Sequence, residues 1–336
     1  MTLAKLSLSA KTKISCLFLT NFELTAVRFV AMLKQIPTFG ICDIDTARFP
    51  SNDLAVYKLN NFIHSSKGLV FPHRHSFYQV LYITEGTGTH VIDFNGYQIE
   101  PGSMFFLAPG QIHEWIFDDA TDGIIVNFSE SFFSTFLANP HYIKDFTFFI
   151  GNGAHSFVDM RGDELSITGL LKNIIAEYNS SDPSRFDVIR FQLLHLFTIV
   201  NRKLSPASEP TTGQNYITQI RNFEKKIEQF YLTKRLPKEY AELLFITPNH
   251  LNAICKQIKG VSAGQMIRDR VQLEAKRLLV NANNNISEIS TLLNFENNSY
   301  FSRFFKQYEG ISPEEFRKNN KKSLFSVKST IDSIKR

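Results

Sequence analysis

The feature that most constrains this chain is a pair of short amphipathic segments near its C-terminal end, separated by a tight turn. In the first segment Ile286, Ile289, Leu292 and Leu293 lie three or four residues apart, a spacing that places them on one face of a short helix. Asn294 follows at once, and asparagine tolerates the left-handed backbone conformation that such a turn needs. The pattern predicts a helix that ends in a sharp change of direction.

A capping pattern marks the start of this helix, and a second helix follows the turn. Asn285 precedes the first helix and Glu288 comes three residues later, which is typical of a capping box. The second helix is expected to turn aromatic side chains inward (Tyr300, Phe301, Phe304, Phe305) and polar or basic ones outward (Asn297, Asn298, Ser302, Arg303, Lys306). This arrangement predicts a helix-turn-helix whose outer face offers amide, hydroxyl and guanidinium groups to base edges and phosphates.

The same residues resemble the signature of AraC/XylS-type transcription regulators over about residues 217–318. The matching motifs are Glu274 to Leu279 (EAKRLL), Ile286 with Ile289, Asn294-Phe295, Ser299 to Lys306 (SYFSRFFK), Gly310, and Ser312 to Arg317 (SPEEFR). Two positions depart from the family pattern, because Ser290 stands where the family has alanine and Asn294 where it has glycine. The resemblance implies two helix-turn-helix units in one chain, preceded by an effector-binding cupin domain.

An upstream copy of the helix-turn-helix is also visible in the sequence. Residues 217–230 form an amphipathic lead helix, and Thr247 followed by Pro248 is a favourable N-cap and first position for a recognition helix. Phe245 falls at the turn position where glycine or asparagine would be easiest, which indicates a different turn or a strained one. A long helix over 261–280 is expected to join the two copies, so that one chain can bind two adjacent major-groove segments of double-stranded DNA.

Eleven side chains on the two recognition helices are predicted to contact DNA. Asparagine pairs with adenine, arginine with guanine, and lysine with phosphate, whereas alanine can touch only a thymine methyl group. We assign base reading to Asn249, Asn252, Asn298 and Arg303; bases or phosphates to His250, Asn297, Ser299 and Ser302; phosphates to Lys256 and Lys306; and a methyl contact to Ala253.

Charge and cysteine content agree with a DNA-binding intracellular protein. Residues 216–336 hold 21 Lys and Arg against 12 Asp and Glu, whereas residues 1–215 hold 16 against 20, so the basic excess lies with the helix-turn-helix units. The three cysteines (Cys16, Cys42, Cys255) form no Cys-x-x-Cys pair, which argues against a disulfide framework and is consistent with a reducing compartment. We expect a cytoplasmic protein with no membrane association and no cofactor.

The region before the linker predicts short strands. Tyr78–Thr84, His90–Phe94, Tyr97–Glu100, Met104–Ala108 and Ile124–Phe128 alternate or run apolar, and Pro101-Gly102, Pro109-Gly110 and Asn95-Gly96 punctuate them, the last as a two-residue hairpin turn. This spacing is typical of a small antiparallel barrel. Within it, His73, His75 and Gln79, then Pro109 to His113, resemble the two cupin motifs, with glutamine where metal-binding cupins have glutamate.

Loss of that carboxylate favours a ligand pocket over a metal site. Six residues are predicted to contact a small effector: His73, His75, Gln79, Tyr82, His113 and Trp115. No metal is expected, although His73, His75 and His113 keep a three-imidazole site geometrically possible. A wider aromatic lining from Phe77, Tyr78, His90 and Phe117 is also expected.

The chain is therefore expected to be an α+β multidomain protein: a cupin-like antiparallel barrel with two helices, then an all-α domain of two helix-turn-helix units joined by a long helix. The expected divisions are an extension over 1–35, the barrel over 36–160, a helical dimerisation segment over 161–204, a linker over 205–216, the DNA-binding domain over 217–320 and a basic tail over 321–336. Translation beginning at Met32 would explain the extension, whose apolar run is too short to span a bilayer.

The predicted function is a dimeric, sequence-specific transcription regulator and not an enzyme, with RNA polymerase as a further partner. Two other classes stay open at this point. One is a metal-dependent cupin enzyme with a helical appendage, which the missing glutamate weakens. The other is an adaptor whose helix-turn-helix domain no longer binds DNA, which the polar faces of both recognition helices weaken.

Overall fold

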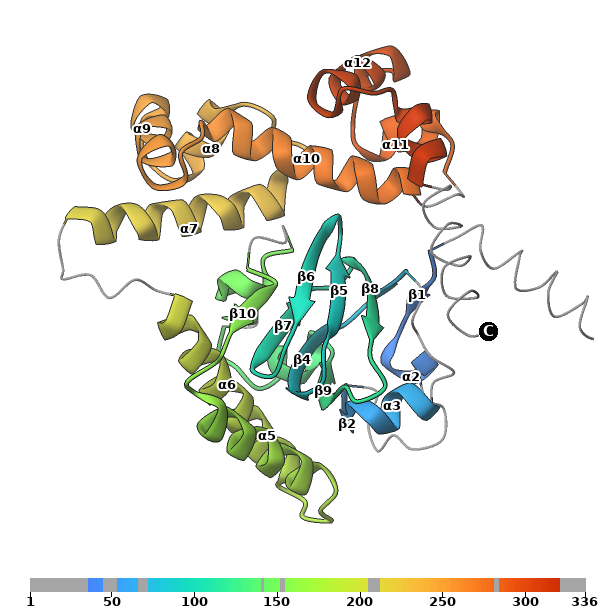
Figure 1. Cartoon of the computed structure of the whole chain (residues 1–336). Helices are drawn as coiled ribbons and strands as arrows, with labels where there is room; N and C mark the ends of the chain where they lie inside the picture. Colours follow the sequence, from blue (N-terminus) through green and yellow to red (C-terminus); the bar gives the residue numbers. More distant parts are fainter. Residues whose placement is uncertain are drawn as a thin grey trace, which may run out of the picture.

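The computed structural model describes residues 36–44, 53–65, 72–139, 142–151, 155–204, 212–280 and 284–320. Its N-terminal part holds two five-stranded sheets, and its C-terminal part is helical (Figure 1). The predicted extension over 1–35 and basic tail over 321–336 lie outside the described residues, as does most of the predicted linker.

One sheet has the strand order β1 (Thr38–Phe39), β3 (His73–His75), β8 (Ile112–Phe117), β5 (Gly88–Ile92), β6 (Asn95–Ile99). The other has the order β10 (Phe157–Asp159), β7 (Ser103–Leu107), β4 (Tyr78–Glu85), β9 (Asp122–Phe128), β2 (Leu54–Lys58). Among the described residues no ladder joins the two sheets, so the predicted barrel is instead a two-sheet sandwich, while the predicted order of a β domain followed by a helical domain is confirmed. The chain passes between the sheets at Pro101-Gly102 and Pro109-Gly110, where Gly102 and Gly110 have φ values of 88° and 86°.

The predicted hairpin turn at Asn95-Gly96 is also wrong. Ile92 pairs with Asn95, so the turn consists of Asp93 and Phe94, and Asn95-Gly96 begin strand β6. Asp93 has a φ of 55°, a left-handed conformation that aspartate tolerates better than most residues. Tertiary contacts of Asp93 and Phe94, described below, selected this turn over the glycine-containing one.

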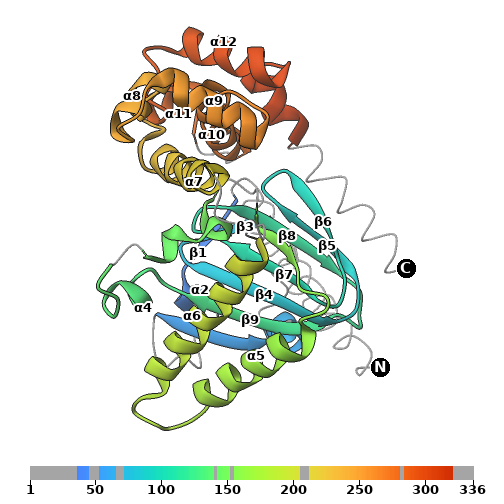
Figure 2. The same ribbon diagram turned by 90° about the vertical axis from the view of Figure 1, so that its left-hand side faces the viewer.

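Side-chain alternation along β4 separates two apolar layers. Val80 and Tyr82 pack in one buried cluster with α5 (Glu164–Tyr178) and α6 (Arg185–Leu204), whereas Leu81 and Ile83 belong to a second cluster between the sheets. Shorter elements complete this part: α2 (Ile41–Ile44), α3 (Leu59–Ser65), α4 (Ser131–Ser134), η1 (Tyr142–Asp145) and η2 (Thr147–Phe149). The two long helices therefore cover their own sheet (Figure 2).

The helical part consists of α7 (Thr212–Phe230), α8 (Pro237–Leu243), α9 (Pro248–Lys259), α10 (Ala263–Val280), α11 (Ile286–Leu292) and α12 (Asn298–Glu309). Helix α7 begins five residues before the predicted start at residue 217. One apolar cluster sits under α7, α8 and α9, and another under α11 and α12, with α10 contributing to both. The two predicted helix-turn-helix units are thus α8–α9 and α11–α12, joined by the predicted long helix.

Candidate DNA-binding face and candidate effector site

Helix α9 begins at the predicted cap. Thr247 Oγ1 accepts a hydrogen bond from His250 N at 3.2 Å, and Pro248 occupies the first turn. Asn249, Ala253 and Lys256 are exposed, as a DNA-facing surface requires.

Two predicted DNA contacts on α9 have other partners in this structure. Asn252 is half-buried, and its Oδ1 accepts a hydrogen bond from Ala263 N at 3.0 Å at the start of α10. Half-buried His250 packs edge-on against Tyr216 of α7, with ring centroids 5.7 Å apart. Asn252 therefore caps the connecting helix, and only its amide nitrogen is left to read a base.

Helix α12 carries the larger polar face. Asn297 is its N-cap and accepts a hydrogen bond from Tyr300 N at 2.9 Å, so its side-chain oxygen is engaged. Exposed positions are Asn298, Ser299, Arg303 and Lys306, while Ser302 is half-buried.

Tyr300 was predicted to face inward, and this prediction is wrong. Tyr300 is 56% exposed, whereas Phe301 and Phe305 fill the core and Phe304 is half-buried. The Arg303 guanidinium lies 5.4 Å from the centre of the Tyr300 ring, and Arg303 Nε donates to Ser299 O at 3.4 Å. Because positions 300 and 303 are three apart on a helix, their proximity was readable in the sequence. Tyr300 thus extends the exposed face around Arg303.

Both turns use the left-handed conformation. Asn294 has a φ of 56°, and Phe295 N donates to Ser290 O, a bond that closes the helix end, as the sequence predicted. Phe245 has a φ of 55° in the equivalent place, where Ile246 N donates to Ala241 O. The first turn has the same geometry as the second, built with a residue that is poorly suited to it.

Direct contacts hold the two units together besides α10. Asn294 Nδ2 donates to Leu232 O at 3.1 Å, and the Arg235 guanidinium donates to Leu293 O and lies 4.9 Å from the Phe295 ring centre. In both views α9 and α12 lie farther from the sheets than α7 and α10 do (Figures 1 and 2). Their exposed faces are therefore not covered by the N-terminal sandwich.

The predicted histidines meet between the two sheets. The side chains of His73, His75 and His113 are at most 2% exposed, and each offers a ring nitrogen within 4.8 Å of the others. His75 Nε2 and His113 Nε2 are 3.3 Å apart. Strand pairing explains the assembly, since His73 lies opposite His113 and side chains two apart on a strand share a face.

A fourth histidine, His90, completes the cluster and is absent from the predicted effector set. Its Nε2 lies 3.1 Å from Nδ1 of His113, and its ring packs on Trp115 and Phe105. Burial is the main cause that lowers the pKa of His90 to about 3, and the neighbouring His73 lowers it further. Burial likewise holds the pKa values of His75 and His113 well below the ordinary value. His75, His90 and His113 are therefore neutral imidazoles at neutral pH.

Gln79 and Trp115 face this interior, but Tyr82 does not. Gln79 Nε2 donates to Asn127 Oδ1 at 2.9 Å, while Gln79 Oε1 and Asn127 Nδ2 are buried with no hydrogen-bond partner in the part of the chain that the structure describes. Trp115 packs edge-on against His113, with ring centroids 5.2 Å apart. Tyr82 belongs to the cluster under α5 and α6, on the opposite face of the sheet, so its assignment to the effector site is wrong. Gln79 and Tyr82 are three residues apart on one strand, which places them on opposite faces.

The histidines fit a transition-metal ion in donor type, but the set lacks a carboxylate that would offset the charge of a divalent ion. His73, His75 and His113 are the one metal-type cluster of three or more such ligands within the described ranges, and no carboxylate belongs to it. A divalent ion held there would keep its full charge in an apolar interior, which is costly. Gln79 Oε1, Asn127 Nδ2 and the Nδ1 atoms of His75 and His90 have no hydrogen-bond partner among the described residues, so they can instead bond to an uncharged polar molecule.

Comparison with known proteins places both parts of the chain. Residues 65–194 match the family described as AraC-like ligand binding domain, and residues 240–319 match the family described as helix-turn-helix domain. An uncharacterised helix-turn-helix transcriptional regulator of Bacillus subtilis, YisR, is 23% identical over 261 residues, which are 72% of this chain and 86% of the relative.

Two relatives with a named regulatory role also span most of the chain. The arabinose operon regulatory protein of Salmonella typhimurium is 23% identical over 68% of this chain and 80% of its own length. The transcriptional activator RhaS of Escherichia fergusonii is 21% identical over 76% of this chain and 90% of its own. The protein is a DNA-binding transcription regulator rather than an enzyme. It belongs to the AraC family of helix-turn-helix regulators, with an AraC-like ligand-binding domain at its N-terminal side.

Proposed function

We propose that this regulator places α9 and α12 in two adjacent major-groove segments of one DNA duplex and that a small molecule bound between its two sheets controls this binding. The observation that carries the proposal is the pair of exposed polar helix faces on the far side of α10 from the sandwich. Successive major grooves on one side of a duplex are about 34 Å apart, and a single rigid connecting helix suits that periodic arrangement.

Exposure divides the predicted DNA contacts into two groups. Asn249, Asn298 and Arg303 are exposed and carry the groups that read adenine or guanine, while Lys256 and Lys306 suit phosphates. The other side chains either already contact groups within the protein or are too short to reach far into a groove. We assign supporting contacts to these residues: His250, Asn252, Ala253, Asn297, Ser299 and Ser302. Tyr300 joins the first group, because its exposed ring holds Arg303 from the side.

The effector site is proposed at the interior histidine cluster, with Trp115 and Gln79 beside it. Its chemistry favours an uncharged polar molecule, since burial holds His75, His90 and His113 neutral and the Gln79 side-chain amide faces the same interior. One relative is named as the arabinose operon regulatory protein, which makes monosaccharides the first compounds to try.

Further proposals concern assembly and location. Helices α5 and α6 pack on their own sheet, yet Phe191 of α6 is 61% exposed and its ring lies 5.5 Å from that of Phe136, so we assign the outer side of α6 to a homodimer contact. Within the described ranges no helix is both long and apolar enough to cross a membrane. We propose a cytoplasmic protein that acts with RNA polymerase, with the sandwich over 36–160, the dimer helices over 161–204 and DNA-binding helices to residue 320.

The test is selection of binding sites from random duplex DNA with the full-length protein, followed by footprinting and a salt titration. The expected result is one enriched sequence, a footprint over two neighbouring groove segments, and an affinity that falls steeply as salt rises. Arg303→Ala should abolish enrichment at one base position, while Lys172→Ala, an exposed lysine on α5, should change nothing. Retention of random DNA without enrichment would refute the proposal.

A thermal-shift screen of monosaccharides tests the effector site separately. A sugar that binds between the sheets should raise the melting temperature of wild type and should fail to do so for His113→Phe, which fills the interior without a ring nitrogen. Equal shifts in both proteins would place the ligand elsewhere.

A further inference from the structure

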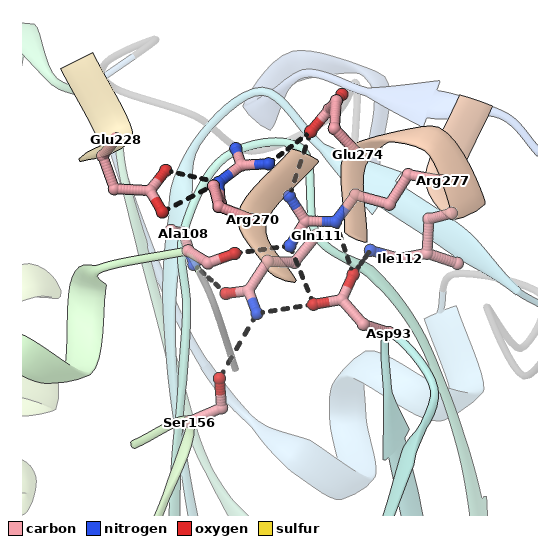
Figure 3. Close-up of polar contacts among 10 residues, drawn as sticks. Asp93, Ala108, Gln111, Ile112, Ser156, Glu228, Arg270, Glu274 and Arg277 are labelled. Atoms are coloured by element: carbon pink, nitrogen blue, oxygen red, sulfur yellow. Dashed lines mark hydrogen bonds and ion pairs between the residues drawn. The ribbon is translucent and has the colours of Figure 1, made fainter. Parts of the chain in front are cut away.

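A buried ion pair joins the ligand-binding sandwich to the DNA-binding domain. Arg277 of α10 donates from Nε to Asp93 Oδ1 at 2.7 Å and from Nη2 to Asp93 Oδ2 at 2.8 Å, a two-point contact (Figure 3). The two side chains are 4% and 1% exposed. A second ion pair between the two parts, Lys225 with Asp145, is about one-third exposed on each side. The Asp93–Arg277 pair is thus fully desolvated, and losing either partner would strand a buried charge.

The sandwich supplies Asp93 with its remaining hydrogen bonds. Gln111 Nε2 donates to Oδ2 at 3.1 Å and Ile112 N donates to Oδ1 at 3.3 Å, while Gln111 Oε1 accepts from Ala108 N. Arg277 Nη2 also donates to Gly151 O at 2.5 Å. These contacts explain why the β5–β6 turn is built on Asp93 and not on Asn95-Gly96.

The ion pair continues into the DNA-binding domain along α10. Arg277 lies 3.4 Å from Glu274, which lies 3.0 Å from Arg270, and Arg270 Nε contacts both carboxylate oxygens of Glu228 on α7 at 2.8 and 2.9 Å (Figure 3). One chain of alternating charges therefore links the β5–β6 turn to α10 and α7, the helices that pack against the cores of the helix-turn-helix units.

The other turn residue reinforces this link. The Phe94 ring lies 5.8 Å from that of Phe316, in the core under α11 and α12, and Lys276 Nζ lies 4.5 Å above the Phe94 ring centre. The sandwich thus contacts the core of the second unit through Phe94, the connecting helix α10 through Arg277, and α7 through Lys225.

The interior histidines lie one residue away from this contact. Ile112, whose backbone N–H donates to Asp93, precedes His113 on β8. Arg74 lies between His73 and His75 on β3 and is half-buried. Burial lowers the pKa of its guanidinium, and the charges of Glu274 and Arg277 also act on that group. A ligand that moves β3 or β8 therefore acts on the contact through a single peptide unit.

We propose that Asp93 and Arg277 form a docking latch, which holds the two helix-turn-helix units in a DNA-competent arrangement and which the histidine-lined interior controls. We assign DNA competence to the latched state and not to the unlatched one, because the docked domain leaves the polar faces of α9 and α12 exposed. The inference rests on the proposed function for its link to an effector, but the latch itself does not. Closure of the latch and DNA binding should favour each other equally, because coupling between two equilibria is reciprocal.

The test is amide hydrogen exchange of the full-length protein together with its affinity for the selected DNA. In Asp93→Asn, exchange over 92–96 and 272–279 should rise by roughly tenfold or more, and DNA affinity should fall by a similar factor, since an uncharged partner leaves Arg277 buried without its counter-charge. Arg277→Lys keeps the charge but loses the two-point contact, so it should give a smaller change of the same sign. The double variant Asp93→Asn with Arg277→Gln should lose no more than the larger single loss.

Asp145→Asn is the matched control, because it removes the partly exposed ion pair between the same two parts and should change both measurements by less than about twofold. His113→Gln tests the link to the interior and should raise exchange over 272–279. Unchanged exchange in both Asp93→Asn and Arg277→Lys would overturn the latch. Unchanged or tighter DNA binding in these variants would overturn the claim that the latched state favours DNA binding. If His113→Gln leaves amide exchange over 272–279 unchanged, the claim that the histidine-lined interior controls the latch is overturned.

Failure of the proposed function gives a different result. If the wild-type protein selects no DNA sequence, the exchange measurements still decide whether the latch exists. If Asp93→Asn does not fold, as judged by its melting curve, Arg277→Lys carries the test.

Discussion

Replacing Phe245 by glycine should stabilise the DNA-binding domain. Phe245 has a φ of 55°, and its side chain is 96% exposed, so the residue carries backbone strain without any compensating burial. A non-glycine residue in the left-handed region costs roughly 1–2 kcal/mol. Glycine removes that cost but adds roughly 0.5–1 kcal/mol of backbone entropy to be lost on folding. The difference predicts a gain of about 0.5–1 kcal/mol.

The measurement is thermal unfolding followed by two signals, tryptophan fluorescence and far-ultraviolet circular dichroism. The single tryptophan, Trp115, lies in the sandwich, so its fluorescence follows that part, whereas far-ultraviolet circular dichroism also follows the helices. For a domain of this size the gain corresponds to a rise of roughly 3–6 °C in the helical transition. Phe245→Ala keeps the strain and should show no such rise, and Asn294→Gly should change little because asparagine already tolerates this conformation.

Equal stabilisation by Phe245→Ala and Phe245→Gly would refute this reasoning. The cause would then be removal of an exposed aromatic ring and not relief of the backbone. A lower melting temperature in Phe245→Gly would show that the ring makes a stabilising contact.

Four further outcomes are expected. Asn285→Ala should lower the free energy of unfolding by about 1 kcal/mol in a circular-dichroism melt, because Glu288 N loses its acceptor at the helix cap. Arg303→Ala should cost about 1–3 kcal/mol of binding to the selected DNA and relax one base, while Lys306→Ala should weaken all sequences alike and reduce the salt slope by about one. Because the folded-state pKa of His90 is about 3 against 6.5 ordinarily, the unfolded chain takes up the proton first as pH falls below 6.5. His90 alone should therefore contribute a loss of about 1.4 kcal/mol of stability per pH unit from pH 6.5 toward pH 3, which urea unfolding can measure, and His90→Asn should remove that share while His75 and His113 keep theirs. Burial raises the pKa of Cys255 to about 11, so iodoacetamide should leave it unmodified at pH 8 until the domain unfolds.

Local patterns in the sequence were sufficient for the helical domain. Helix periodicity, the caps at Thr247 and Asn285, and the turn at Asn294 are decided within a few residues of chain, and the structure confirms each of them. The proximity of His73 and His113 was also predictable, because both lie in motifs that resemble those of a known metal-binding fold. Tyr300 and Tyr82 were misplaced even though helical and strand periodicity, counted more strictly, would have placed them correctly.

Long-range contacts decided the rest. Whether the strands close into a barrel depends on which sheet each strand joins. A Pro-Gly pair predicts a turn but does not predict the sheet in which the next strand lies. The β5–β6 turn formed at Asp93 because Arg277, 184 positions along the chain, supplies a buried counter-charge that no local preference for Asn-Gly could outweigh. The sequence alone determined the elements of the DNA-binding domain, since short-range hydrogen bonds and helix periodicity define them. Only the tertiary structure decided how that domain docks on the sandwich, since the docking contacts, Asp93–Arg277, Lys225–Asp145 and Phe94–Phe316, join residues that are far apart in the sequence.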